Sequence, residues 1–181
     1  MEASRRDGYR PHELAPSPLS ATITMKPPMN FVDLLGDGPK TVRESEWLVI
    51  PQGDIDAFGQ LTRDPDPNHI DPAWARAHSP FGGPIAFGFQ TLSMLTWLIK
   101  SAGATPVDAV HVVNYGFDRV RFVSPVHAGS AIQGRFTIES VTLRSPVQAQ
   151  VRYGVEVVAR DATKPVLVAQ WLALFERAAP T

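Results

Sequence analysis

Apolar and polar positions alternate along much of the carboxyl-terminal half of the chain. Four segments there are rich in β-branched and aromatic side chains, and they cover residues 111–123, 131–143, 147–160 and 165–176. Turn-forming residues, including proline, glycine, serine and aspartate, separate these segments. The pattern therefore predicts four strands in succession.

The segment before these strands is apolar on nearly every side of a helix. It covers residues 86–102 and has no consistently charged face. A helix of this kind must be enclosed by other structure, and the strands that follow can enclose it. The order predicts an α+β fold, a single domain in which an antiparallel sheet wraps around a central apolar helix.

Shorter elements are predicted nearer the amino terminus. A short apolar turn covers residues 31–35, and a strand covers residues 46–50, where Pro51 ends it. Apolar residues at helical spacing then predict an amphipathic helix that ends at Arg63, with Asp54 as its cap.

Prolines shape the next stretch and also the start of the chain. Pro65 and Pro67 cannot continue the helix, so we expect a stiff, irregular loop over residues 64–70, followed by a short helix over residues 72–77. Five of the 17 prolines lie in the first 30 residues, which show no periodic pattern. We predict that residues 1–30 form an extended or disordered arm, or an arm laid over a partner subunit, and that residues 31–181 form the domain.

Composition excludes several classes of protein. The formal net charge of -1 offers no general attraction to nucleic acid, and the absence of cysteine excludes disulfides, thiolate metal sites and a cysteine nucleophile. The longest apolar stretch, residues 85–99, is shorter than the roughly 20 residues that span a bilayer. The amino terminus has no continuous apolar segment typical of a signal peptide. We expect a cytoplasmic protein that binds neither nucleic acid nor membrane.

The proline-rich loop carries the clearest candidate chemistry. Asp64 and His69 are five residues apart, and the two prolines between them restrict the chain, so their side chains can converge on one small volume. A carboxylate and an imidazole that share a water can act as a general acid/base pair near neutral pH. The alternative is ordinary turn chemistry, since aspartate favours turns whatever the function.

Glycines flank the start of the apolar helix. Gly83 precedes Pro84, and Gly88 lies in the first turn, where backbone N–H groups lack helical partners and can hold a developing oxyanion. The alternative is that these glycines only permit a tight turn and close helix packing.

Together these motifs resemble a known family. The order Asp-x4-His-x-Asp-Pro at residues 64–72, Phe-Gly-Gly-Pro-Ile-Ala-Phe-Gly at 81–88, and Asn-Tyr-Gly-Phe-Asp-Arg-Val-Arg-Phe at 114–122 is similar to the MaoC-like (R)-specific enoyl-CoA hydratases of the hot-dog fold. The resemblance covers roughly residues 46–176. It implies reversible addition of water to a trans-2-enoyl thioester, giving an (R)-3-hydroxyacyl thioester, without a metal or redox cofactor.

The resemblance also implies roles for individual residues. Asp64 and His69 would be the catalytic pair, and Gly88 would donate its backbone N–H to the thioester carbonyl. The residues expected to contact substrate are Gly83, Pro84, Ile85, Phe87, Thr96 and Arg121. Three positions depart from the family: Asp66 stands where asparagine is frequent, Asn68 where an aliphatic residue is frequent, and Phe87 where histidine is common.

Several assignments stay open. Arg119 and Arg121 alternate along one predicted strand, so they either meet an anionic coenzyme A phosphate or pair with a neighbouring carboxylate. Coenzyme A is favoured over acyl carrier protein as the acyl carrier, because no clear basic patch is visible. Three further histidines lack ligand spacing, which argues against a metal site; they are His78, His111 and His127.

Two other functions compete with the hydratase. A hot-dog thioesterase usually has a carboxylate on or beside the central helix, whereas residues 85–99 contain no aspartate or glutamate. A catalytically silent acyl-thioester-binding subunit is suggested by Asp66 and Phe87. In each case a lone sheet would have a free edge, so we predict a homodimer with sheets joined edge to edge and each site completed near the interface.

Overall fold

Four long antiparallel strands form most of one curved sheet in the computed structural model, which describes residues 29–36, 42–160 and 162–179. They are β3 (Ala109–Phe122), β4 (Ala131–Ser145), β5 (Gln148–Ala159) and β6 (Leu167–Arg177). Two very short strands, β1 (Arg43–Glu44) and β2 (Leu48–Val49), both pair with β4, and the sheet order is β1-β4-β5-β6-β3. The four predicted strands are therefore confirmed, each within a few residues of its expected bounds.

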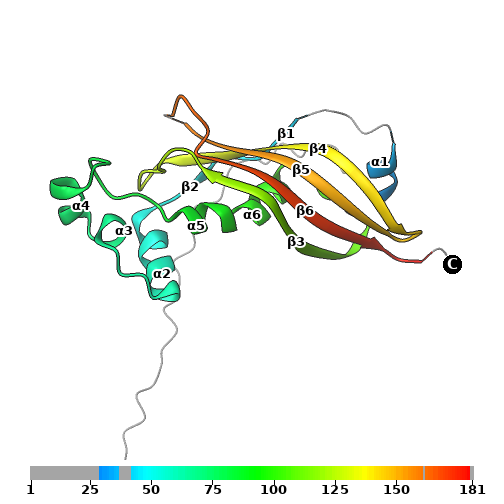
Figure 1. Cartoon of the computed structure of the whole chain (residues 1–181), viewed down its shortest axis with the longest axis horizontal. Helices are drawn as coiled ribbons and strands as arrows, with labels where there is room; N and C mark the ends of the chain where they lie inside the picture. The colour runs from blue at the N-terminus through cyan, green and yellow to red at the C-terminus, as the bar shows by residue number, and fades with distance from the viewer. Residues whose placement is uncertain (1–28, 37–41, 161, 180–181) are drawn as a thin grey trace, which may run out of the picture.

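The apolar helix runs beneath the curved sheet (Figure 1) and consists of α5 (Gly88–Ser93) and α6 (Leu95–Ser101). A single helix over residues 86–102 was expected, but Met94 interrupts the helical assignment. The Met94 N–H still donates to the Gln90 carbonyl at 3.1 Å, so helical hydrogen bonding continues up to the interruption. Leu95 and Leu98 are fully buried under the sheet, which confirms the predicted α+β arrangement.

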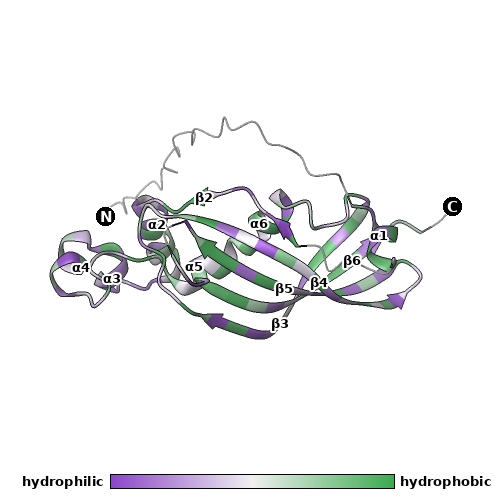
Figure 2. Cartoon of the chain, turned by 90° about the horizontal axis from the view of Figure 1, so that it is seen from above, coloured by the Kyte–Doolittle hydropathy of each residue, from purple (hydrophilic) through white to green (hydrophobic). Residues whose placement is uncertain are grey.

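Alternation within the strands decides which face of the sheet covers the helix. Along β5 every second side chain is buried, among them Val151, Tyr153, Val155 and Val157. Figure 2 shows the corresponding change between apolar and polar residues along the strands. Tyr153 is wholly buried, and its hydroxyl donates to the carbonyl of Ala104 at 2.8 Å. Burial raises the pKa of this phenol.

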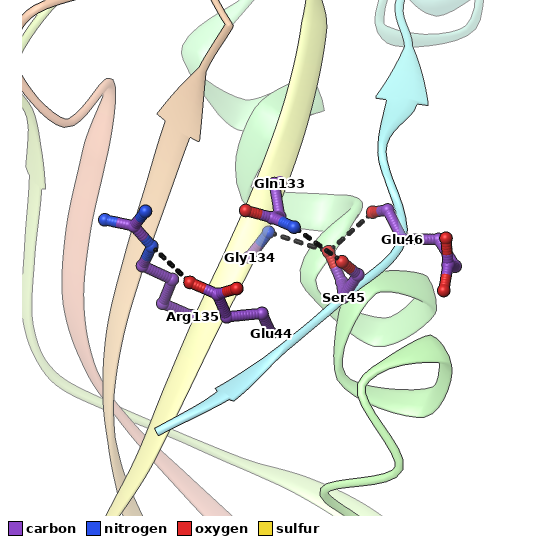
Figure 3. Close-up of polar contacts among 6 residues, drawn as sticks. All are labelled: Glu44, Ser45, Glu46, Gln133, Gly134 and Arg135. Atoms are coloured by element: carbon purple, nitrogen blue, oxygen red, sulfur yellow. Dashed lines mark hydrogen bonds and ion pairs between the residues drawn. The ribbon is translucent and has the colours of Figure 1, made fainter. Parts of the chain in front are cut away.

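Within the strand predicted over residues 46–50 only β2 (Leu48–Val49) forms, and a second short strand that was not predicted, β1 (Arg43–Glu44), precedes it. Ser45 lies between them and is buried. Its hydroxyl accepts the Gly134 N–H at 2.8 Å and donates to the Glu46 carbonyl at 2.7 Å (Figure 3). The side chain thus takes over a ladder hydrogen bond that a continuous strand would have made, and hydrophobicity alone does not predict this break.

Three short helices lie together beyond one end of the sheet (Figure 1): α2 (Gln52–Thr62), α3 (Pro67–Ile70) and α4 (Pro72–His78). Pro51, not Asp54, occupies the cap position of α2, and Arg63 ends this helix with a left-handed φ of 58°. The loop expected over residues 64–70 contains the single helical turn α3. Proline in the first position suits a helix start, which the loop prediction overlooked.

The opposite end of the sheet carries α1 (Phe31–Leu35), where the apolar turn was expected. Met29 is buried and forms a bridge with Pro106, and Asn30 caps α1, so both residues belong to the folded domain. The rest of the predicted arm lies outside the described residues. Among the helices that the structure describes, none is long and apolar enough to cross a membrane.

Candidate active site

A cavity of about 280 Å³ lies where α3, the start of α5 and the end of β3 meet. Its walls include His69, Ile85, Gly88, Thr91, Phe122 and Val126. Most of these side chains are apolar, and His69 supplies the titratable group. A concave, largely apolar space with a few polar groups is the usual form of a small-molecule site.

Hydrogen bonds fix the position of His69 from two sides. Its Nδ1 lies 2.7 Å from the carbonyl oxygen of Ile85, and the amide of Gln52 donates to the His69 carbonyl at 2.7 Å. A carbonyl oxygen only accepts, so Nδ1 of the neutral ring carries the proton and Nε2 is left as the basic nitrogen. This is the tautomer required of a general base that works through Nε2.

The helical turn that carries His69 is stabilised by Asp66. One carboxylate oxygen of Asp66 accepts both the backbone N–H and the side-chain amide of Asn68, at 2.8 and 2.9 Å. These two hydrogen bonds favour the charged carboxylate and lower the pKa of Asp66 below its usual value. The two polar departures from the family pattern, Asp66 and Asn68, are thus one structural pair that caps α3.

Aromatic packing covers one face of the His69 ring. The Phe87 ring is stacked on it, with the centroids 3.8 Å apart and the planes at 29°. Phe58 of α2 lies next to Phe87, with its ring centroid 5.3 Å away.

Gly88 is the first residue of α5 and lies in the wall of the same cavity as His69. Its N–H belongs to the first helical turn, which leaves it without a carbonyl acceptor from the helix itself. A Cβ at this position would stand only 3.1 Å from the Phe122 ring. Glycine therefore suits the close approach of the Phe122 side chain of β3 to the start of α5.

The structure does not bring Asp64 into contact with His69. Within the described residues no hydrogen bond or ion pair joins them, and Asp64 does not line the cavity. Its exposed carboxylate accepts the N–H of Asp66 at 3.3 Å and lines a separate depression beside Gly59 and Ile70.

The expected substrate-contacting residues separate into two groups. Ile85 lines the cavity and Phe87 contacts His69, whereas Gly83, Pro84, Thr96 and Arg121 are not in its wall. Thr96 is exposed and its hydroxyl donates to the Ser93 carbonyl; Arg121 is exposed and donates to the Val120 carbonyl.

Thr91 is a cavity residue that the sequence reading missed. It is buried, and its hydroxyl donates to the Phe87 carbonyl at 3.3 Å. Its position three residues after Gly88, on the same face of the helix, is the signal that points to it. Across the described residues, no group of three histidine or acidic side chains is arranged to hold a metal ion.

Comparison with known proteins now decides the family. A protein-family model described as the MaoC like domain matches residues 36–159. The chain belongs to the MaoC-like family. The resemblance predicted from the sequence motifs is confirmed for most of the domain.

The chain is similar to several known proteins and to several solved structures. Nodulation protein N of Rhizobium meliloti (strain 1021) is 42% identical over 130 residues, 72% of this chain and 81% of that protein. The 3-hydroxyacyl-thioester dehydratase Z of Mycobacterium tuberculosis is 35% identical over 143 residues, 78% of this chain and 92% of that protein. The R-hydratase structure from Pseudomonas aeruginosa has a TM-score of 0.61 and 21% identity, covering 77% of this chain and 82% of that one, which shows that this MaoC-like chain has the same hot-dog fold.

Proposed function

We propose that the protein is a hydro-lyase that reversibly adds water to a trans-2-enoyl thioester, giving an (R)-3-hydroxyacyl thioester. The observation that carries the proposal is that His69 and Gly88 line the same cavity. An imidazole can supply a base, and the first turn of a helix can supply a backbone N–H donor. A relative named 3-hydroxyacyl-thioester dehydratase supports the reaction class.

The proposed chemistry needs one base and one oxyanion donor. The Gly88 N–H would bind the thioester oxygen, where negative charge develops as the enolate forms. Nε2 of His69 would take a proton from water while the water oxygen bonds to C3. The proton taken from water is then returned to C2, by His69 or through Asp64, as the C2–C3 double bond becomes a single bond; one water is consumed and the base is regenerated. No metal or redox cofactor takes part in these steps.

Asp64 is the proposed second proton-handling group. To act, its carboxylate must leave the Asp66 N–H and turn toward the cavity. That hydrogen bond is long, at 3.3 Å, and exposed, so releasing it requires little free energy. The rate of crotonyl-CoA hydration by the Asp64→Asn variant tests this step.

The substrate is proposed to be an acyl-coenzyme A. The apolar wall residues Phe81, Phe122 and Val166 would contact the acyl chain. Arg121 has no ion pair among the described residues and remains a candidate for a phosphate of coenzyme A. For Gly83, Pro84 and Thr96 we propose at most contacts with the carrier, because none of them lines the cavity.

We also propose a homodimer through β3. This strand is last in the sheet order, and within the described chain its outer edge has no strand partner. Val112, Phe117 and Phe122 of β3 are exposed, and Phe89 of α5, 71% exposed, lies against Phe122. A free edge bordered by aromatic side chains is usually covered. Since Phe122 is also a cavity wall, the second copy would lie close to the site.

The direct test is incubation of the pure protein with crotonyl-CoA. We expect the absorbance of the enoyl thioester to fall, and chiral analysis to show the (R)-3-hydroxy product. Release of free thiol would instead indicate a thioesterase. Tight binding without either product would indicate an acyl-binding subunit.

A further inference from the structure

Phe87 occupies a position from which it controls the His69 ring. It is 5% exposed and precedes α5 directly. One face of its ring meets the imidazole, and Phe58 lies next to it. Its ring tip, Cζ, would be only 3.2 Å from a Cβ on Gly59, so α2 closes the space beyond the tip. Phe87 is thus wedged between α2 and the imidazole and has little room to turn.

The hydrogen bonds of His69 do not fix its ring plane alone. The bond from Nδ1 to the Ile85 carbonyl fixes where Nδ1 lies, and the Gln52 amide holds only the backbone. The ring can still leave this hydrogen bond by turning about its Cβ–Cγ bond, because a single hydrogen bond adds little net free energy, and such a turn would move Nε2. A flat ring stacked at 3.8 Å removes this freedom.

We propose that Phe87 is a positioning residue, whose ring holds the imidazole plane of His69 so that the imidazole keeps its place in the cavity wall. The expected effect of Phe87 on kcat rests on the proposed function, whereas its effect on the orientation of the His69 ring does not. Phe87 exchanges no proton and contacts no reacting atom. A flat side chain at this position should preserve the arrangement, and a branched one of similar volume should not.

Two substitutions at Phe87 distinguish the effect of a flat ring from the effect of side-chain volume. Phe87→Leu keeps most of the apolar volume without a ring, and Phe87→His keeps a flat ring. We expect Phe87→Leu to lower kcat for crotonyl-CoA hydration about 10²-fold, the loss typical of a misplaced catalytic group, while KM changes much less. Phe87→His should retain most of the wild-type kcat. Because this variant keeps a ring, it still tests the proposal if Phe87→Leu fails to fold.

A spectroscopic readout tests the positioning without any activity. Long-range ¹H–¹⁵N spectra of the neutral imidazoles report the tautomer, and His69→Gln identifies the His69 signals. We expect the wild type to show the Nδ1–H tautomer, with ring protons shifted upfield by the stacked Phe87. Phe87→Leu should lose the upfield shift and average the two tautomers. Phe81→Leu, which removes another aromatic wall of the cavity, should keep the tautomer.

The outcomes distinguish this inference from the function. If His69 keeps the Nδ1–H tautomer in Phe87→Leu, or Phe87→Leu keeps full kcat in an active enzyme, Phe87 does not position the histidine. If the wild type does not hydrate crotonyl-CoA, the proposed function fails, and the spectra alone then decide whether Phe87 holds the ring.

Discussion

Gly59 is a residue whose missing side chain shapes the site. An added Cβ would lie 3.0 Å from Ile70, 3.1 Å from the Asp64 carbonyl and 3.2 Å from Phe87. Gly59→Ala should therefore lower the free energy of unfolding by about 1–3 kcal/mol, the usual cost of overpacking. Gly53 of the same helix has nothing within 4 Å of its Cβ position, so Gly53→Ala should be neutral or stabilising by up to about 1 kcal/mol. Urea unfolding measures both, and equal effects would contradict the close packing at Gly59.

Tyr153 should make stability depend on alkaline pH. Burial raises the pKa of its phenol in the folded chain above the value of 10.0 that it has when unfolded. Above pH 10 the unfolded chain ionises there and the folded chain does not. The stabilising effect of the neutral phenol is thus complete below pH 10 and is lost as pH rises toward the folded pKa, by up to ~1.4 kcal/mol per pH unit.

The comparison variant is Tyr153→Phe, which cannot ionise. Near neutral pH it should be less stable than the wild type by about 1–3 kcal/mol, because the Ala104 carbonyl loses its buried donor. Denaturant titrations from pH 8 to 11 should show this difference shrinking above pH 10. A difference that stays constant across this range would show that Tyr153 is not shielded from ionisation.

The sequence identifies some site residues and misplaces others for physical reasons. His69 could be found because two prolines limit where an imidazole at that position can go. Thr91 and Thr96 could not be told apart, since both are polar residues on one apolar helix. The rotation of that helix decides between them, and it is set by the burial of Leu95 and Leu98. The orientation of Asp64 depends on a single weak hydrogen bond, which no sequence pattern encodes.

At the scale of an element, Ser45 joins two strand fragments to β4. Ser45→Ala would leave the buried Gly134 N–H without its acceptor, so we expect a loss of about 1–3 kcal/mol in the free energy of unfolding. Ser140 of β4 is exposed, and no described hydrogen bond involves its hydroxyl, so Ser140→Ala serves as the control. A loss at Ser45 no larger than that at Ser140 would show that the bridge adds nothing to stability.

Long elements are more predictable than short ones in this chain. Three of the four long strands, β4, β5 and β6, alternate over part of their length and bury one face, whereas β3 is exposed along most of its length and follows from its β-branched and aromatic residues. The two-residue strands β1 and β2 and the single turn α3 depend on individual hydrogen bonds, from Ser45 and to Asp66. Ser45 and Gly134 are far apart in the sequence, and the hydrogen bonds to Asp66 depend on side-chain geometry. Hydrophobic periodicity therefore predicts neither.

At the scale of the whole molecule, the exposed edge of β3 predicts association. Sedimentation should give a mass near twice 19.8 kDa. Phe89→Asp should shift the protein toward the monomer by placing a charge in the apolar surface beside β3. Leu61→Asp is the matched control, since Leu61 is 81% exposed on α2, away from that edge. A wild-type monomer, or dissociation by both substitutions alike, would contradict the β3 interface.

The most direct test of the whole account is the rate of crotonyl-CoA hydration in three proteins: wild type, His69→Gln and His78→Gln. His78 lies on the exposed surface of α4, where its ring stacks on Trp74, and it does not line the cavity. We predict that the wild type hydrates the substrate, that His69→Gln lowers kcat/KM about 10²- to 10⁴-fold, and that His78→Gln leaves it unchanged. An inactive wild type, or full activity in His69→Gln, would contradict the account.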